Sequence, residues 1–216
     1  MSTISVLLVD DHAIVREGYR RLLAQHADIA LVGEALDATQ AYAQFCALSP
    51  RVVVMDIGLP GQSGIHALTR MLAREPDARV VVYSMHDELV YVRKSLQAGA
   101  LGYVSKRCAP ETLVEAIRHA AMRRRYLSPD VAQAMAMPAQ SEEERALQSL
   151  TAREFEVLRG LLEGESVAAI AERLSITAKT VANLQSSLKQ KLNVDTATQL
   201  VRLGLRNGLL GSSGAP

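Results

Sequence analysis

Two hydrophobic patterns alternate along the first 125 residues of the chain. Short runs rich in β-branched residues predict strands, and they do not alternate apolar with polar positions, as expected for strands covered on both faces. The predicted strands are residues 4–10, 29–34, 52–56, 80–84 and 101–104. After each strand the apolar residues recur at helical spacing, as Val15, Tyr19 and Leu22 do after the first, so each strand is followed by a predicted helix.

This alternation predicts βαβ units and therefore a parallel sheet. Five units predict a doubly wound α/β domain over residues 1–125, with a five-stranded parallel sheet and a ligand site beyond the carboxyl ends of the strands. Residues 126–148 break the pattern with Ser128-Pro129, Pro138 and three consecutive glutamates. We interpret this segment as a linker that is helical in part.

Residues 149–211 contain only helical patterns and predict a small all-α domain. Cap signals open each of its four predicted helices. These signals are Thr151 with Glu154, Ser166, Thr177, and Thr196 with Gln199. The second and third helices are joined by a short turn, and the third is the longer of the two, spanning residues 178–192. This order of a short helix, a turn and a longer helix indicates a helix-turn-helix.

Composition narrows the class of protein. Hydrophobic residues make up 49% of the chain, but no apolar run approaches the ~18 residues that a membrane span requires. The N-terminal run leads straight into Asp10 and Asp11, so we interpret it as a strand and not as a signal peptide. Cys46 and Cys108 have no metal-ligand spacing, and we interpret them as reduced thiols of a cytoplasmic protein.

Five polar residues lie at the ends of the predicted strands. Asp10 and Asp11 end the first strand, Asp56 ends the third, Ser84 ends the fourth, and Lys106 lies just past the fifth. Because the carboxyl ends of parallel strands share one edge, all five are expected to converge there. Three carboxylates at such short range repel one another and need a compensating cation. Their oxygens suit Mg²⁺, and Lys106 supplies a second positive charge.

This arrangement fits the transfer of a phosphoryl group to a carboxylate. Asp56 would be the nucleophile, Mg²⁺ and Lys106 would neutralise the phosphoryl oxygens, and Ser84 would donate a hydrogen bond to one of them. Each acid taken singly is equally compatible with a solvated loop residue, but the convergence of all five favours a phosphoryl site. We interpret the flanking His12 and His86 as loop residues and not as ligands.

The residues around this site resemble the receiver domain of bacterial response regulators over residues 1 to about 122. The similarity lies in residues 7–12 (LLVDDH), 55–64 (MDIGLPGQSG), 83–87 (YSMHD) and 102–106 (GYVSK). It implies that a histidine kinase phosphorylates Asp56 and that Ser84 and Tyr103 rearrange together on phosphorylation. The metal site that it implies consists of Asp11, Asp56 and the backbone carbonyl of Gly58, with Asp10 acting largely through water.

Basic charge is concentrated in one part of the C-terminal domain. The net charge of the chain is +1, but residues 173–206 carry six lysines and arginines against one acid. Residues 149–172 carry two arginines against five glutamates. This distribution suits contact with the phosphates of nucleic acid.

The helix predicted over residues 178–192 has an apolar stripe and a polar stripe. Val181, Leu184, Leu188 and Leu192 form the first, and Lys179, Asn183, Ser186 and Gln190 form the second. Asparagine can read adenine in the major groove, and lysines suit phosphates. An ordinary amphipathic helix with a solvated face has the same pattern, so the stripe alone leaves both interpretations open.

The wider segment resembles the LuxR-type helix-turn-helix over residues 149–210, and a receiver followed by this domain is typical of the NarL/FixJ family of response regulators. The similarity lies in residues 150–158 (LTAREFEVL), 170–174 (IAERL), 180–181 (TV) and 191–192 (KL). It implies a dimer on paired half-sites, with the final helix as a dimer contact. The candidate DNA contacts are Lys179, Thr180, Asn183, Ser186, Lys189, Gln190 and Lys191.

Two positions in this helix depart from the family pattern. Ala182 and Leu184 stand where the family often has a basic residue and a histidine or tyrosine. Leu184 fits the apolar stripe, so we expect it to pack, and Ala182 could touch a thymine methyl group. The departure affects the expected operator sequence and leaves the predicted fold unchanged.

We therefore expect a cytoplasmic transcription factor, and not an enzyme, whose DNA binding is controlled by phosphorylation of Asp56. Its expected cofactor is Mg²⁺. Its expected partners are a histidine kinase, double-stranded DNA and, when phosphorylated, a second copy of the chain, with no membrane. A weakly basic recognition helix is also compatible with an adaptor that has lost DNA binding. An aspartyl-phosphate phosphatase is disfavoured, because the loops between strands and helices are too short to contain a substrate-binding insertion.

Overall fold

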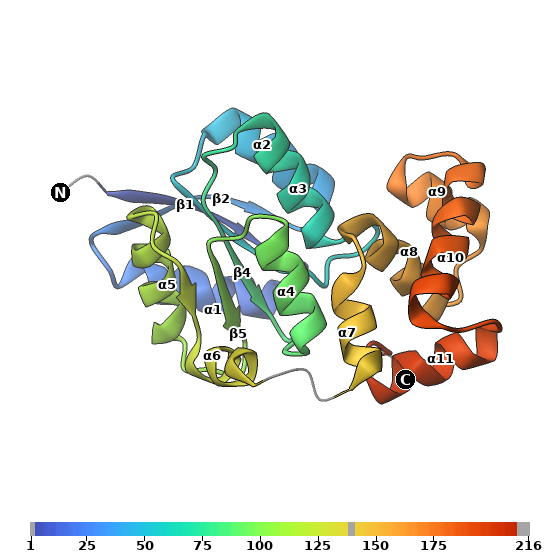
Figure 1. Cartoon of the computed structure of the whole chain (residues 1–216). Helices are drawn as coiled ribbons and strands as arrows, with labels where there is room; N and C mark the ends of the chain where they lie inside the picture. Colours follow the sequence, from blue (N-terminus) through green and yellow to red (C-terminus); the bar gives the residue numbers. More distant parts are fainter. Residues whose placement is uncertain (1–2, 138–140, 211–216) are drawn as a thin grey trace. The chain divides into compact units, whose positions relative to one another are not determined.

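The apolar runs of the N-terminal part form one parallel sheet with the strand order β2-β1-β3-β4-β5-β6 (Figure 1). The strands are β1 (Ile4–Val9), β2 (Ile29–Ala35), β3 (Val52–Met55), β4 (Val80–Ser84), β5 (Gly102–Ser105) and β6 (Tyr126–Leu127). Every residue of β3, β4 and β5 is buried, as expected from apolar runs without alternation. From β1 the chain adds β2 on one side, and it adds β3 and the later strands on the other. This reversal of strand order places a ligand site beyond the carboxyl ends of β1 and β3.

Helices cover both faces of this sheet (Figure 1). They are α1 (Ala13–Ala24), α2 (Ala38–Leu48), α3 (Gly64–Arg74), α4 (Leu89–Gln97) and α5 (Glu111–Ala121). Helices α1 and α5 share one core with a face of the sheet, where Leu23, Val54 and Ile117 are each about 1% exposed or less. The opposite face is covered by α2, α3 and α4 (Figure 1). The predicted doubly wound α/β architecture is confirmed.

The sheet has six strands and not the five predicted. The sixth strand, β6, lies within the segment interpreted as a linker, and it pairs in parallel with β5 through Gly102 and Tyr103. A two-residue strand has no detectable periodicity, because its conformation depends on the neighbour with which it pairs. Helix α6 (Pro129–Ala136) follows at once, with the proline in its first turn.

The chain divides into two units, Met1–Met137 and Pro138–Pro216. The structure is a computed structural model that describes residues 3–137 and 141–210. Of the predicted linker, residues 126–137 thus belong to the first unit, residues 141–148 belong to the second, and residues 138–140 lie outside the described part. Residue 211, the predicted end of the DNA-binding domain, also lies outside it.

The second unit contains five helices in its described part. They are α7 (Glu142–Ser149), α8 (Ala152–Leu162), α9 (Val167–Leu174), α10 (Ala178–Leu192) and α11 (Ala197–Arg206). Both predicted capping boxes are confirmed, at Thr151 with Glu154 and at Thr196 with Gln199. The core contains Phe155, Ile170 and Leu188, which are each 1% exposed or less. The two domains predicted from the sequence therefore have the predicted fold classes.

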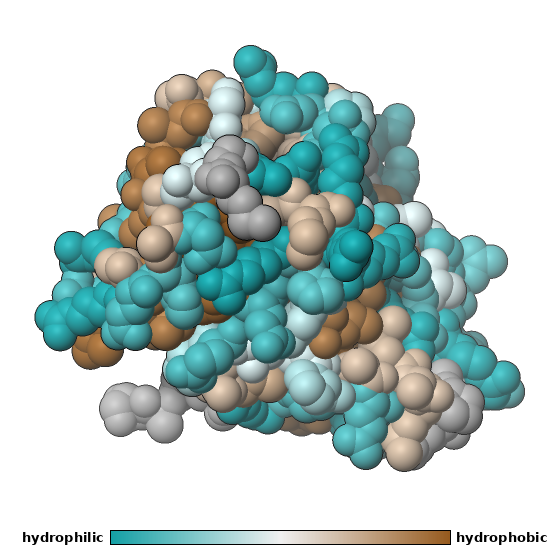
Figure 2. Space-filling model, turned by 90° about the vertical axis from the view of Figure 1, so that its left-hand side faces the viewer, coloured by the Kyte–Doolittle hydropathy of each residue, from teal (hydrophilic) through white to brown (hydrophobic). Residues whose placement is uncertain are grey.

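Figure 2 shows one face of the first unit. On the side where the chain enters β1, hydrophilic side chains predominate, with hydrophobic ones visible between them (Figure 2). Among the helices of the described residues, none has both the length and the apolar character required to cross a bilayer.

Candidate functional site

Two aspartates at the carboxyl ends of β1 and β3 form the centre of the first candidate site. Asp10 follows β1 and is 1% exposed, and Asp56 follows β3 and is 4% exposed. Together with Asp11 and His12 they form a group whose potential ligand atoms all lie within 4.8 Å of one another. Unpaired carboxylates are costly to bury, so this arrangement requires compensating positive charge.

Lys106 supplies one such charge. Its Nζ lies 2.5 Å from Asp10 Oδ2 and 2.5 Å from Asp56 Oδ2, and its side chain is only 6% exposed. Burial lowers the pKa of Lys106, but the charge of Asp56 and the hydrogen bonds to both aspartates more than offset this, so the pKa is raised overall. Lys106 therefore remains an ammonium ion at the centre of the site.

The second oxygen of Asp56 is held by two donors. Ser84 Oγ donates to Asp56 Oδ1 at 2.8 Å, and the Gly58 amide donates to the same oxygen at 3.0 Å. The loop that follows packs closely here, because a Cβ on Gly64 would lie 2.0 Å from the Asp56 carbonyl oxygen. The Asp56 carboxylate is thus fixed in orientation, as a positioned nucleophile must be.

The remaining acid fits a hard cation. Asp11 Oδ1 is shielded from solvent and accepts no hydrogen bond from the described residues, although His12 Nδ1 lies 2.9 Å from it. Three carboxylates, one of which has a shielded oxygen that accepts no hydrogen bond from the described residues, match the oxygen ligands that Mg²⁺ prefers. The His12 ring is largely exposed and also lies 3.3 Å from Asp10 Oδ1. We interpreted His12 as a loop residue, and the structure brings it into this group.

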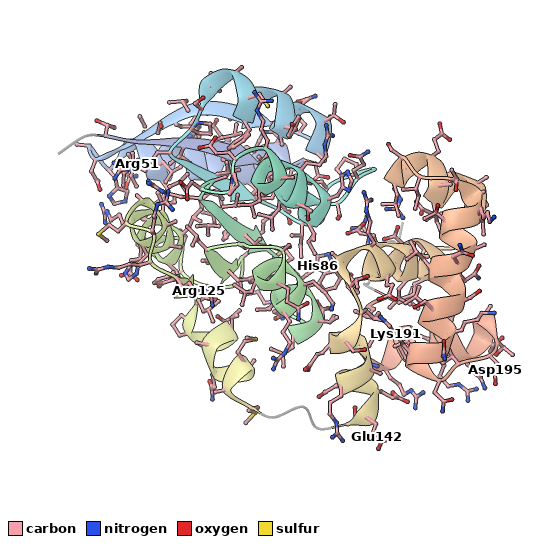
Figure 3. All side chains as sticks on the ribbon, turned by 45° about the horizontal axis from the view of Figure 1, so that its top comes forward. Arg51, His86, Arg125, Glu142, Lys191 and Asp195 are labelled. Atoms are coloured by element: carbon pink, nitrogen blue, oxygen red, sulfur yellow. The ribbon has the colours of Figure 1, made fainter. Side chains whose placement is uncertain are left out.

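Tyr103 on β5 lies fully buried beside the site, where its hydroxyl donates to the backbone carbonyl of His86. Burial, and then the charge of Asp56, raises the pKa of Tyr103 well above its usual value. The phenol therefore stays protonated and acts as a donor. The His86 ring stacks on Tyr91 of α4 with the ring centroids 4.6 Å apart. His86 lies beside the start of α4 (Figure 3).

An aromatic pair near Lys106 was not predicted from the sequence. Tyr83 on β4 is 3% exposed, and the Lys106 ammonium lies 5.6 Å from the centre of its ring. The Tyr83 hydroxyl contacts the hydroxyl of Tyr19 on α1. Burial, and then the charge of Asp10, raises the pKa of Tyr19. The sequence contains one signal for the position of Tyr83. Successive residues of a strand point to opposite faces of the sheet, so Tyr83 must face away from its neighbour Ser84.

The second candidate site is α10 of the helix-turn-helix. Helix α9 ends at Ser175, whose φ of 54° lies in the left-handed region and turns the chain toward α10. Helix α10 spans the predicted residues and packs on both α8 and α9. On its outer side Lys179, Asn183 and Gln190 are exposed, and none of these three side chains has an intramolecular polar partner within the described part of the chain.

The other candidate DNA contacts already have intramolecular partners. Thr180 Oγ1 lies 2.9 Å from Thr177 Oγ1, and Ser186 donates to the Ala182 carbonyl at 3.0 Å. Lys189 Nζ donates to the Asp195 carbonyl at 3.1 Å. These three side chains are therefore less available to a ligand than Lys179.

Lys191 forms an ion pair inside the unit. Its Nζ lies 2.8 Å from Oε2 of Glu154, a carboxylate of α8 that is about 5% exposed. Lys191 comes from the last turn of α10 (Figure 3). Glu154 also accepts hydrogen bonds from Ser187 at 2.7 Å and from the Thr151 amide at 2.7 Å. Burial raises the pKa of Glu154, but these donors outweigh it and lower the pKa to about 2.

Comparisons with known proteins find matches for both units of the chain. Residues 6–118 match the family described as response regulator receiver domain, and residues 148–203 match the luxR family of bacterial regulatory proteins. The chain is 39% identical to the transcriptional activator protein ExaE of Pseudomonas putida over 208 residues, covering 95% of this chain and 97% of that protein. It is 37% identical to the response regulator UvrY of Escherichia coli over 209 residues, covering 95% of each.

Solved structures give the same result. The structure of RcsB from Salmonella enterica serovar Typhimurium, bound to promoter rprA in the presence of the phosphomimetic BeF3-, matches with a TM-score of 0.73. The sequence identity is 26%, and the match covers 94% of this chain and 98% of that one. A LuxR-family two-component response regulator from Aurantimonas is 44% identical, with a TM-score of 0.61, over 62% of this chain and 96% of that one.

Proposed function

Because the chain belongs to the response regulator family of two-component signalling proteins, with a receiver domain and a LuxR-family DNA-binding domain, we propose that phosphorylation of Asp56 controls its binding to double-stranded DNA. The observation that carries this proposal is the environment of Asp56, a buried carboxylate between Lys106 and the donors Ser84 and Gly58. Proteins of this family regulate transcription and are not enzymes, which removes the phosphatase alternative.

The chemistry follows from these contacts. An Asp56 oxygen attacks the phosphorus of a phosphohistidine on the kinase, a phosphorus–oxygen bond forms, and the phosphorus–nitrogen bond to the kinase histidine breaks. Lys106 neutralises charge on the transferred group, and Ser84 donates to one of its oxygens. Mg²⁺ bound by Asp11, Asp56 and the Gly58 carbonyl, with Asp10 acting largely through water, would supply further positive charge to the phosphoryl oxygens. Tyr103 and Ser84 then rearrange together.

Two exposed surfaces of the chain support the proposed protein partners. Val201 and Leu205 of α11 lie one turn apart and are 38% and 63% exposed, which suits a contact between two DNA-binding units. RcsB forms dimers on DNA in a solved structure. Ile14 of α1 is 89% exposed immediately after the acidic cluster, and it lines a hollow between α1 and the start of α5, where a histidine kinase would dock. From these proposed partners we infer that the protein acts in the cytoplasm.

Measurements of Mg²⁺ affinity distinguish the proposed role of Asp11 from that of Ser84. Asp11→Ala is expected to weaken Mg²⁺ binding by at least about tenfold, because it removes a carboxylate ligand. Ser84→Ala serves as the matched control and is expected to bind Mg²⁺ almost as the wild type does, since the serine contacts Asp56 and not the ion. Isothermal titration calorimetry with MgCl₂ measures both affinities. Equal affinities of the wild type and Asp11→Ala would rule out the ligand assignment.

Measurements of DNA affinity distinguish residues that contact phosphates from residues that contact bases. Lys179→Ala is expected to weaken binding to all sequences and to flatten the dependence of log K on log salt by about one unit. Lys189→Ala should flatten it less, because the Lys189 ammonium already donates to a backbone carbonyl. Asn183→Ala is expected to cost about 1–3 kcal/mol on the preferred site with little loss on random DNA. Salt titrations on specific and random duplexes measure these effects.

The same titration tests the adaptor alternative. That alternative is favoured by one observation, the engagement of Lys189 and Lys191 with partners inside the unit. If Lys179→Ala and Asn183→Ala both bind DNA as the wild type does, α10 does not lie in the groove and the adaptor alternative gains. An equal loss on both duplexes in Asn183→Ala would instead exclude a base-reading role for that residue.

A further inference from the structure

The segment that follows α5 is attached to the strand that carries Tyr103. The Tyr126 amide donates to the Leu101 carbonyl at 3.1 Å, and the Ser128 amide donates to the Tyr103 carbonyl at 3.0 Å. The two backbones lie so close that a Cβ on Gly102 would be 2.8 Å from the Tyr126 carbonyl oxygen. This segment is therefore a strand of the sheet, and its backbone is bonded to β5.

Ser128 uses its side chain in an unusual way for its position. It occupies the N-cap of α6, where a serine hydroxyl ordinarily accepts a hydrogen bond from its own helix, yet it makes no such bond. Its Oγ accepts from the Ser105 amide at 3.3 Å instead, and the residue is fully buried. The Ser128 oxygen thus accepts from the end of β5, and its hydroxyl also bonds to Asp130 in the first turn of α6.

The residue next to Ser105 belongs to the phosphorylation site. Lys106 follows it directly, and the Lys106 amide donates to the Ser84 carbonyl at 2.8 Å. Lys106 is thus the next residue after the one that Ser128 holds, and Ser84 is bonded to Lys106 through the backbone. No other element of the fold lies between these two residues and the backbone that Ser128 holds.

Helix α6 is packed against the same region. It lies against α4 and β5, and its buried residue, Val131, is 2% exposed. The loop between β5 and α5 adds a polar contact, because Cys108 Sγ lies 3.2 Å from Asp130 Oδ1. Helix α6 is the last element of the first unit, and the chain continues from it into the second unit.

We propose that Ser128 couples the phosphorylation site to α6, so that the segment from β6 to α6 is the output element of the first unit and not a passive linker. When Asp56 is phosphorylated, Lys106 and Ser84 turn to the phosphoryl oxygens and the end of β5 shifts. The Ser105 amide carries this shift to Ser128, and α6 changes its packing on α4. This inference rests on the proposed function, since it requires phosphorylation of Asp56.

The test uses the full chain with beryllofluoride as a stable phosphoryl mimic. In the wild type, beryllofluoride is expected to change amide hydrogen exchange in residues 126–137 by at least about fivefold. Ser128→Ala should still bind beryllofluoride, but the exchange change in this segment should be lost. The stimulation of DNA binding by beryllofluoride should fall by about fivefold, the equivalent of one hydrogen bond.

The controls separate the possible failures. Ser149→Ala removes a serine hydroxyl that donates to the Ala146 carbonyl of its own helix, and it should keep the full stimulation. Full stimulation in Ser128→Ala would overturn the proposal. Unchanged exchange of residues 126–137 in wild type that has bound beryllofluoride would overturn it without any variant, so misfolding of Ser128→Ala does not leave the question open. Failure of the wild type to bind beryllofluoride would instead refute the proposed function itself.

Discussion

Replacing Asp56 with asparagine is expected to abolish labelling of the chain by acetyl phosphate in the presence of Mg²⁺, by more than about a thousandfold. The change removes both the nucleophilic oxygen and one metal ligand while leaving the volume of the side chain almost unaltered. The amide can still accept from Ser84 and Gly58, so the loop keeps its anchors. Lys106 keeps its second partner, Asp10, and is not left as an unpaired buried charge.

Asp37→Asn is a matched control for this experiment. Asp37 caps α2 by accepting from the Gln40 amide at 2.8 Å, and asparagine caps a helix equally well. This variant should be labelled as the wild type is, with intact mass measuring the phosphoryl adduct in each protein. Labelling that persists in Asp56→Asn would show that the acceptor is another residue.

Glu154→Gln is expected to destabilise the DNA-binding unit by about 2–4 kcal/mol. The buried carboxylate accepts from Ser187, Lys191 and the Thr151 amide, and it joins the start of α8 to the end of α10. A glutamine has only one accepting oxygen and turns an NH₂ group toward one of these donors. Lys191 would then lose its ion-pair partner at the same time.

The same carboxylate predicts a pH dependence. The pKa of Glu154 is lowered in the folded unit to about 2, whereas its usual value is 4.5. A lowered pKa means that the stabilisation is fully present above pH 4.5 and is lost as the pH falls toward 2, by a total of about 3 kcal/mol. In Glu154→Gln this part of the acid destabilisation should disappear.

Native-state hydrogen exchange of α8 and α10 at a series of pH values measures both effects. Glu172→Gln, at an exposed position of α9, is the matched control and should change stability by less than about 0.5 kcal/mol. A Glu154→Gln unit as stable as the wild type at neutral pH would show that the network does not hold α8 to α10.

The sheet and its site could be predicted because their signals repeat along the chain. Apolar runs alternate with helical patterns, and parallel pairing brings every strand's carboxyl end to one edge. Asp10 and Lys106 are 96 positions apart, yet both stand at a strand end, so their approach followed from topology. The capping boxes at Thr151 and Thr196 could be predicted equally well, because a capping box is formed by residues three positions apart.

Other features depended on contacts that no local pattern encodes. Lys189 and Lys191 belong to the basic charge of the helix, and only the folded unit shows that their ammonium groups bind Asp195 and Glu154. Glu154 lies 37 positions from Lys191, and neither residue has a sequence signal for the other. Lys179 and Asn183 are distinguished from their neighbours by having no such partner among the described residues.

The segment after α5 shows most clearly which structure the sequence alone does not predict. Its proline, serine and acidic residues are those of a linker, and the sequence alone assigns it no place in the sheet. Its first residues become β6 because the open edge of β5 offers unpaired backbone groups, and Gly102 leaves room for the approach. The sequence by itself determined the two fold classes and the acidic edge of the sheet, since these follow from periodicity. Only the tertiary structure decided which polar groups meet across the fold, because hydrogen bonds and ion pairs depend on distances in space and not along the chain.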